Sequence, residues 1–428
     1  MNGFLESLNV AIESDILITI GLLIGLAFLG SKVFQRLGIP QVVGFIVIGV
    51  LLGESFLNLV PLELIENLDF VSEIALGLIG FDIGGHLLFR ELGKYGRSIV
   101  LILMFQSVGT MIVVGAAIYL ITQNVALALL MGAIASATAP ASTVDVLAEY
   151  DTKGPLTTHI LAIVGLDDGM ALLLFSFAAA MTESLLMDSG APTLLEIIEL
   201  PVVEIGGSIL LGLAAGLLLE VILRRMKSHH DAMAISIAFV FVCVGLSRAL
   251  GLSLILTSMV LGMIVVNRDP EHGRHIRFTI EQAGPVIYVL FFALVGARLQ
   301  ISLLPSMGVI GVIYLLVRFS SKYSGAWLGA YLGKSDRTVR DYLGLALLSQ
   351  AGVAIGLALT SAERFAEFGP RGAEIGLQIL NVVTATTFVT QLIGPVLVKF
   401  AVNRAGEIGK AREETDIWAS EGSPEIRG

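Results

Sequence analysis

The sequence is poor in charge and in cysteine. Only 14% of its 428 residues are charged, whereas 55% are hydrophobic, and the mean hydropathy is +0.88. This composition excludes a soluble globular domain and a disordered chain, and it indicates a polytopic membrane protein. The single cysteine, Cys243, cannot form an internal disulfide, so the fold does not depend on oxidation. The net charge of −10 argues against a nucleic-acid partner.

Long apolar runs occupy most of the chain. A helix needs about 20 mainly apolar residues to cross a lipid bilayer, and about thirteen runs approach or reach this length. We therefore expect an all-α membrane protein with about thirteen transmembrane helices. The predicted helices lie near residues 15–34, 40–53, 69–88, 98–121, 125–148, 156–181, 200–224, 232–249, 252–267, 278–297, 303–332, 340–361 and 374–400.

The basic residues predict how these helices are oriented. With the N-terminus outside, the cytoplasmic loops and tail hold 20 of the 26 Lys and Arg residues, and the external loops hold 4. Since basic residues favour the cytoplasmic side, we expect a protein of the cell (inner) membrane with its N-terminus outside and its C-terminus inside. Residues 1–14 would then be external, residues 15–400 would form the transmembrane domain, and residues 403–428 would form a cytoplasmic tail.

Short sequence patterns recur at a nearly constant offset. The matched pairs are 78–80 with 294–296, Gly49 with Gly262, and 136–142 with 349–355, at offsets of 216, 213 and 213 residues. Each pair joins predicted helices seven apart, so the two copies must cross the membrane in opposite directions. This pattern is typical of the inverted repeats of secondary transporters. We expect two six-helix halves, about 15–181 and 232–400, joined by a connector helix at about 200–224.

Two predicted helices carry polar interruptions at matching positions. In the run 125–148, Pro140 lacks an N–H group and clashes with the preceding turn, next to Ser142. In the run 340–361, Gln350 and Gly352 interrupt the apolar sequence. A proline kink that serves packing alone is the alternative for the first run. Interrupted helices at equivalent positions of two halves are a sequence indicator of a transport site.

Two adjacent acids, Asp167 and Asp168, lie in the middle of the apolar run 156–181, near the predicted bilayer midplane. Ionised side chains are costly there, so both acids are candidates for a functional site. Neighbouring helix residues point about 100° apart, so the two carboxylates must face different partners. Arg318 and Lys322 share one face of another helix and are the candidate charge partners. A structural ion pair between two helices is the alternative reading of this cluster.

Hydroxyl groups near the interruptions could complete an oxygen cage around a cation. The candidates are Thr138, Ser142, Thr143, Thr384, Thr386 and Thr387. Each hydroxyl could instead bond to the backbone of its own helix. A carboxyl removed from water favours its neutral form, so a proton and a hard monovalent cation could compete for one acid. Such competition is the basic chemistry of a cation/proton exchanger.

Seven motifs resemble those of a known family. They are IPQVVGFIVIGVLLGE (39–54), GLIGFDIGGHLL (77–88), SATAPASTVDVL (136–147), GLDDG (165–169), FFALVGARL (291–299), KYSGAWLGAYLG (322–333) and SQAGVAIGLAL (349–359). Together they resemble the monovalent cation/proton antiporter superfamily, most closely its bacterial and archaeal two-aspartate sodium/proton branch. GLDDG after an interrupted helix is the most specific combination. The similarity extends over nearly the whole chain.

The resemblance implies a homodimer in which two interrupted helices cross inside a mobile core domain that moves as an elevator. It implies that Asp168 binds the cation or proton, with Asp167 as a secondary ligand that pairs with Lys322. Thr138 and Thr143 fall at family hydroxyl positions. The chain departs from the electroneutral branch at Ala139, where that branch has a carboxylate, although Arg318 is similar to an arginine of that branch.

The sequence therefore predicts an electrogenic exchanger of Na⁺, or Li⁺, for H⁺ that needs no cofactor and works in the lipid bilayer. A K⁺/H⁺ antiporter and an electroneutral Na⁺/H⁺ exchanger on the same fold are the alternatives. An intramembrane aspartyl protease is a remote alternative, because Tyr150-Asp151 precedes the GLDDG motif. Such a protease needs two acids from different helices to meet within the membrane, whereas Asp151 is predicted to lie in a cytoplasmic turn.

Overall fold

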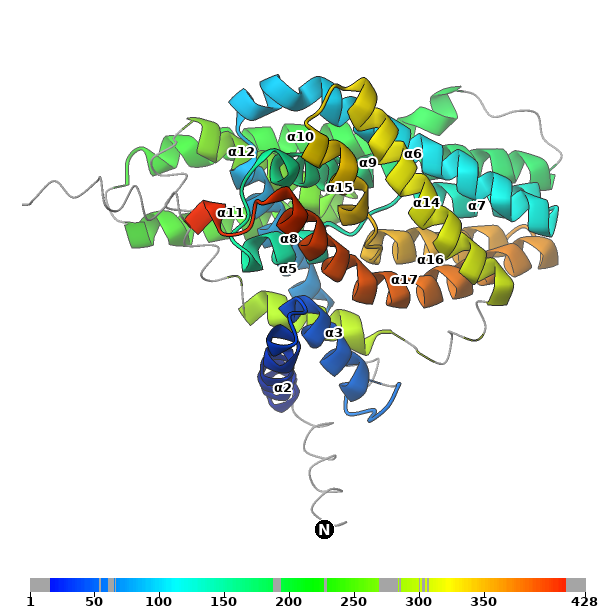
Figure 1. Ribbon diagram of the computed structural model, residues 1–428, viewed down its shortest axis with the longest axis horizontal. Helices are drawn as coiled ribbons and strands as arrows, with labels where there is room; N and C mark the ends of the chain where they lie inside the picture. Colours follow the sequence, from blue (N-terminus) through cyan, green and yellow to red (C-terminus); the bar gives the residue numbers. More distant parts are fainter. Residues whose placement is uncertain are drawn as a thin grey trace, which may run out of the picture.

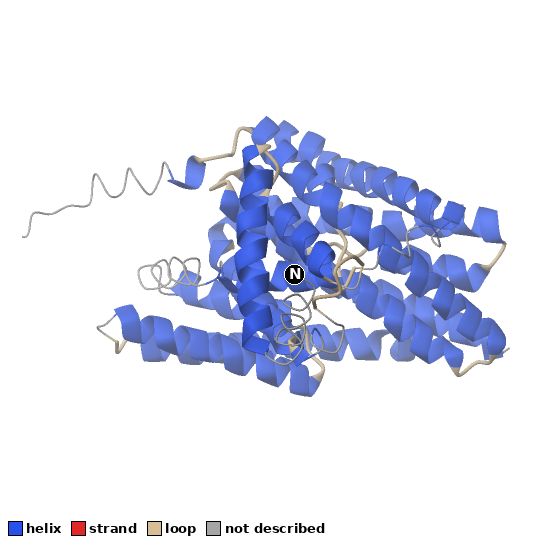
Figure 2. Ribbon diagram, turned by 90° about the horizontal axis from the view of Figure 1, so that it is seen from below, coloured by secondary structure: helices blue, strands red, loops and turns tan. Residues whose placement is uncertain are grey.

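The computed structural model describes residues 16–53, 55–60, 65, 67–187, 194–226, 229–268, 284, 286–299, 301, 305 and 308–412. Within these residues the regular elements are helices, as Figure 2 shows. They are α2 (Ile16–Arg36), α3 (Gln41–Leu52), α5 (Asp69–His86), α6 (Phe89–Thr122), α7 (Val125–Ala135), α8 (Pro140–Glu149), α9 (Pro155–Met187), α10 (Leu194–Leu223), α11 (His229–Leu250), α12 (Leu254–Arg268), the helix Val286–Ala297, α14 (Gly308–Leu332), α15 (Arg337–Ala346), α16 (Gly352–Ala366) and α17 (Pro370–Ala405).

Within the described residues, each predicted apolar run overlaps a helix or a pair of half-helices, while parts of the starts of the runs 278–297 and 303–332 lie outside those residues. Seven helices of the described part are long and apolar enough to cross a membrane by themselves. Three more are apolar but shorter, namely Gln41–Leu52, Leu254–Arg268 and Val286–Ala297. The all-α membrane fold is thus confirmed, while the number of crossings and the orientation stay predictions.

Helix α9 lies between two groups of helices (Figure 1). On one side it contacts α6, α7, α16 and α17, and of these α6 and α17 also contact α14. On its other side it contacts α10, α12 and α5. The helix that carries both acids therefore forms part of the boundary between the two groups.

Two glycines let helices from the two predicted halves approach each other closely. A Cβ atom at Gly49 in α3 would collide with the backbone of Ala293, and one at Gly262 in α12 would collide with the backbone of Phe81 in α5. These are the same glycines that the sequence offset matched. Their equivalent contacts support the inverted repeat, which remains a prediction.

The segment after α17 packs against the turn between α8 and α9. The amide of Gly409 donates to the carbonyl of Tyr150 over 3.0 Å, and the Glu407 side chain is buried. The Glu407 carboxylate accepts from the amides of Leu156 (2.8 Å) and Thr157 (2.7 Å), in the first turn of α9. Amides of a first helical turn have no partner inside the helix, so this distant carboxylate caps α9. Part of the predicted tail is therefore integral to the fold.

Replacing Glu407 with alanine should destabilise the protein by about 2 kcal/mol, because it leaves buried amides without an acceptor. The measurement is thermal unfolding of the purified protein in detergent, where the midpoint should fall by several degrees. Glu374→Ala, at an exposed position near the start of α17, is the matched control and should leave the midpoint unchanged. Equal midpoints for Glu407→Ala and the wild type would show that the cap contributes nothing.

Candidate functional site

Both predicted interruptions are breaks between half-helices. Helix α7 ends at Ala135 and α8 begins at Pro140, while α15 ends at Ala346 and α16 begins at Gly352. Pro140 occupies the first turn of α8, where its missing N–H group costs nothing. The two linking stretches touch, since the Ala139 amide donates to the Ser349 carbonyl over 3.0 Å. The two interrupted helices therefore meet at their breaks, and their crossing stays a prediction.

Arg318 holds the two breaks together. Its guanidinium is fully buried and donates to the carbonyls of Ala135 (3.0 Å), Ala137 (2.8 Å), Leu348 (2.7 Å) and Ser349 (3.4 Å). Breaking a helix leaves carbonyls without their usual donors, and these must be satisfied within the protein. Arg318 is one of the two charge partners that the sequence offers for the acids; its guanidinium hydrogen-bonds to these backbone carbonyls, whereas Lys322 pairs directly with Asp167.

Gln350 is a second side chain that joins the breaks. Its amide nitrogen donates to the Ile134 carbonyl over 3.1 Å and to the Tyr314 hydroxyl over 2.9 Å. The backbone carbonyl of Gln350 in turn accepts from the Thr390 hydroxyl over 3.4 Å. Gln350 thus ties α7, α14 and α17 to the second break, so its role here is to stabilise the crossing.

Asp167 lies in a buried cluster of polar side chains. Its carboxylate accepts from Lys322 Nζ (3.1 Å), Gln106 Nε2 (2.6 Å) and Ser107 Oγ (2.8 Å), and from the Thr138 hydroxyl. Asp167 and Lys322 are both 0% exposed, and Lys322 also donates to Thr138. The predicted pairing of Asp167 with Lys322 is present, and Thr138 from the first break takes part in it.

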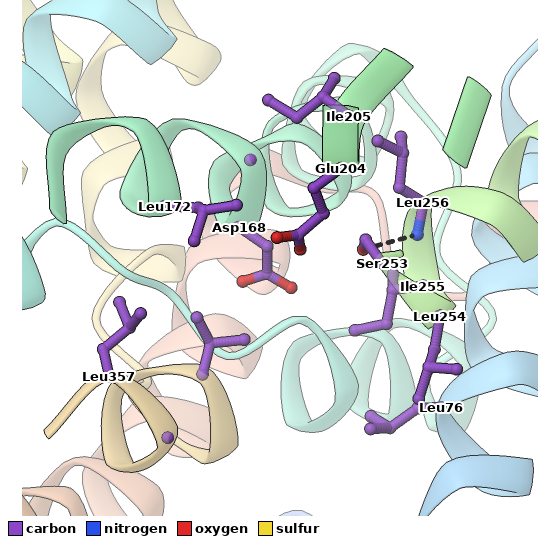
Figure 3. A pocket seen from close by; sticks show the side chains of 13 residues that line it. Leu76, Asp168, Leu172, Glu204, Ile205, Ser253, Leu254, Ile255, Leu256 and Leu357 are labelled. Carbon is purple, nitrogen blue, oxygen red and sulfur yellow. Dashed lines mark hydrogen bonds between the residues drawn. The ribbon is translucent and has the colours of Figure 1, made fainter. Parts of the chain in front are cut away.

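Asp168 faces the other way, into a pocket with a volume of about 270 Å³. The pocket lies between α9, α10, α12 and the start of α16, and Figure 3 shows the Asp168 and Glu204 carboxylates pointing into it. The buried Oδ1 atom of Asp168 has no hydrogen-bond partner among the described residues. The two acids therefore differ in the way that helix geometry predicts: Asp167 is fully paired, while Asp168 has an oxygen available to a ligand.

The other hydroxyl groups predicted as cation ligands fall into two groups, those bonded to their own helix and those without a partner. Thr143 donates to the carbonyl of Ala139 in its own helix over 3.2 Å, and Thr386 bonds to its own helix in the same way. Ser142 and Thr387 are buried with hydroxyls that lack a hydrogen-bond partner within the described part of the chain. Thr143 is therefore placed beside the first break, but its hydroxyl serves the backbone.

Three residues at the site were not predicted from the sequence. Gln106 and Ser107 form the only adjacent pair of polar residues in the apolar run 98–121, and this pair is a signal for a polar site. Glu204 is one of two acids in the run 200–224, with Glu220, and membrane acids are candidates for function in general. Nothing in the sequence indicates which helices lie beside α9, so the partnership of these residues with Asp167 and Asp168 had to come from the structure.

Comparison with known proteins finds related membrane transporters. Residues 21–404 match the family model described as "Sodium/hydrogen exchanger, transmembrane". An Na(+)/H(+) antiporter of Enterococcus hirae is 24% identical over 382 residues, which cover 87% of this chain and 94% of the relative. The Na(+)/H(+) antiporter NhaS4 of Synechocystis is 26% identical over 340 residues, covering 73% of this chain and 81% of the relative.

A solved structure shares the fold. The sodium proton antiporter MjNhaP1 of Methanocaldococcus jannaschii superposes with a TM-score of 0.73 at 18% identity, covering 91% of this chain and 96% of its own. With the apolar helices described above, these matches identify a multi-pass membrane protein and a transporter rather than an enzyme. Because the family model covers most of the sequence, the chain belongs to the transmembrane sodium/hydrogen exchanger family.

Proposed function

We propose that this protein exchanges Na⁺ for H⁺ across the membrane and that Asp168 binds the two ions alternately. The observation that carries the proposal is the contrast between the acids: the Asp167 carboxylate is saturated by four donors, whereas Asp168 presents an unbonded oxygen to a pocket. A carboxylate that can hold either a cation or a proton, but not both, couples the two movements. Na⁺ is the proposed ligand of Asp168, and no cofactor is needed for this chemistry.

An open pocket on one side of Asp168 and closing contacts on the other side support alternating access to this residue. The pocket is lined by the part of α9 that follows Asp168, by the first residues of α12, such as Leu254, and by Ser253 just before α12. With the N-terminus outside, this side of Asp168 is external. At the opposite ends of the helices, the Gln41 amide donates to Glu149 over 2.8 Å and Lys399 donates to the Gly38 carbonyl over 2.6 Å. These contacts join α8 and α17 to the α2–α3 turn and would close the internal side.

The pair of Asp167 and Lys322 supports an electrogenic cycle. A buried lysine can release its proton when its partner changes, whereas an arginine stays protonated. Lys322 therefore offers a second proton-binding group besides Asp168. If both groups release a proton in each cycle, more protons than Na⁺ ions cross the membrane and net charge moves. An elevator-like movement of the helices around the two breaks, within a homodimer, belongs to the same proposal.

Other cargoes remain distinct alternatives on this scaffold. K⁺ or Li⁺ could replace Na⁺, because the cage geometry around Asp168 sets the preferred ion, and an electroneutral cycle would use Asp168 alone. The protease alternative is dropped, since the family consists of transporters and Asp151 lies in an exposed turn after α8. Localisation in the inner membrane with an external N-terminus is part of the proposal and follows from the basic loops.

The test is ion exchange by the purified protein in liposomes with an imposed pH gradient. Na⁺ should dissipate the gradient and K⁺ should do so much less, because the pocket joins a carboxylate to few other oxygens and favours a small cation. With the membrane voltage clamped at several values, an electrogenic cycle changes its rate with voltage. Equal responses to Na⁺ and K⁺ would contradict Na⁺ as the preferred cargo. A transport rate that does not change with voltage would contradict the exchange of unequal numbers of protons and Na⁺ ions.

A further inference from the structure

A second acid faces Asp168 across the pocket. Glu204 comes from α10, the helix that connects the two predicted halves, and its carboxylate points toward that of Asp168 in Figure 3. Glu204 is half-buried in a helix whose neighbouring Val202 and Val203 are exposed on the apolar surface. An acid in such a helix usually turns its charge toward water or a partner. Here it turns toward the pocket instead of the lipid-facing surface.

A glycine next to Asp168 allows α10 to pack closely against α9. Gly169 follows the acid directly, and a Cβ atom there would lie 3.2 Å from Cδ1 of Ile205, the residue after Glu204. That distance is tighter than an ordinary van der Waals contact, so a larger residue would force the Ile205 side chain to shift, whereas glycine keeps α9 and α10 close. The last glycine of the GLDDG motif thus allows Glu204 to reach the Asp168 pocket.

A serine pair fixes the turn of α10 that carries Glu204. The Ser208 hydroxyl donates to the Glu204 carbonyl over 2.6 Å and accepts from the Ser253 amide over 2.9 Å. This bridge holds the start of α12 against α10 and places Ser253 in the pocket wall. The pocket wall therefore holds the carboxylates of Asp168 and Glu204, and the Ser253 hydroxyl, which also accepts from the Leu256 amide over 3.3 Å.

Two carboxylates that face each other repel unless a positive charge lies between them. The rest of the wall is hydrocarbon, from side chains such as Leu76, Leu172 and Ile205, so it screens the repulsion poorly. A bound monovalent cation removes that repulsion and gains attraction to both acids at once. Oxygen atoms are also the ligands that Na⁺ finds at breaks and cavities in transporters.

We infer that Glu204 is a second cation-contacting carboxylate of the Asp168 site and sets its affinity for the cation. This inference rests on the proposed exchange function and adds a residue to it. Asp168 alternates between cation and proton, while Glu204 raises the affinity of the outward-facing pocket for the cation. Glu204 lies on a different helix from Asp168, so the full oxygen set exists only while α9 and α10 hold this arrangement.

The experiment compares exchange kinetics of the wild type and Glu204→Gln in liposomes at fixed pH. The variant should raise the KM for Na⁺ about tenfold and leave the maximal rate within about twofold, because one of two attracting charges is lost. Glu204→Asp keeps the charge and should recover most of the affinity. Glu220→Gln is the matched control on the same helix, since the Glu220 carboxylate already pairs with Arg224; its KM should stay unchanged.

A second measurement reports binding without transport. Na⁺ should raise the thermal midpoint of the wild-type protein in detergent, and half of this rise should need about tenfold more Na⁺ in Glu204→Gln, with choline chloride keeping the ionic strength constant. A KM and a half-stabilising concentration equal to those of the wild type would overturn the inference while leaving the exchange function intact. Exchange that survives Asp168→Asn would instead overturn the role of Asp168 in the proposed exchange, so the two failures are distinguishable.

Discussion

Asp168→Asn should abolish Na⁺-driven proton exchange, with a loss of at least about 100-fold. Asparagine has nearly the same shape as aspartate, but it cannot carry the negative charge that attracts the cation, nor can it take up and release the proton. The pocket in which Asp168 presents its unbonded oxygen would remain, but neither ion would be held. The measurement is the rate at which Na⁺ dissipates a pH gradient in liposomes that contain equal amounts of folded protein.

Asp151→Asn is the matched control for this substitution. Asp151 is exposed in the turn after α8 with φ 46°, a left-handed conformation that asparagine also adopts readily. The control removes the same charge without affecting the pocket and should keep the wild-type rate. Exchange by Asp168→Asn at a comparable rate would contradict the assignment of both ions to this carboxylate.

Arg318→Ala should have the largest effect on stability, with a loss of about 4 kcal/mol. The substitution removes a buried guanidinium that donates to four carbonyls around the two breaks, and no water is expected to replace it in the packed interior. Arg318→Lys keeps the charge but offers a single donor group, so it should recover only part of the loss. Thermal unfolding in detergent and the yield of monodisperse protein measure the effect.

Arg337→Ala provides the control, because the Arg337 side chain is 87% exposed and pairs with Asp341 on the surface of α15. An exposed pair of this kind contributes little, so the midpoint should hardly change. If Arg318→Ala unfolds at the wild-type temperature, the carbonyls at the breaks must be satisfied in another way, and the role assigned to Arg318 is wrong.

The sequence alone determined the features that depend on local chemistry. Apolar runs of sufficient length predict helices, because each helix satisfies its own backbone in lipid. Pro140 predicts a break because it cannot continue a helix, and the structure has that break. The adjacency of Asp167 and Asp168 predicts carboxylates that face apart, and this too is observed, since the side-chain directions follow from the helical period.

Only the tertiary structure decided which side chains meet. Arg318 and Lys322 share one face of α14, so the sequence offered both as partners of the acids. They lie about 6 Å apart along that helix, one full turn, so they reach different levels of the neighbouring helices. Arg318 lies beside the breaks and donates to their backbone carbonyls. Lys322 lies one turn further along α14 and pairs with Asp167.

Glu204 illustrates the same limit on the opposite side of α9. Its charge within an apolar run was visible in the sequence, but its neighbour was not, because α10 could have packed with any face toward α9. Gly169 and the Ser208–Ser253 bridge fix that packing through contacts between segments 36 to 45 residues apart. The sequence thus determined the helices, the breaks and the acids, whereas the packing between helices determined that Asp167 is bonded to Lys322 and that Asp168 faces Glu204.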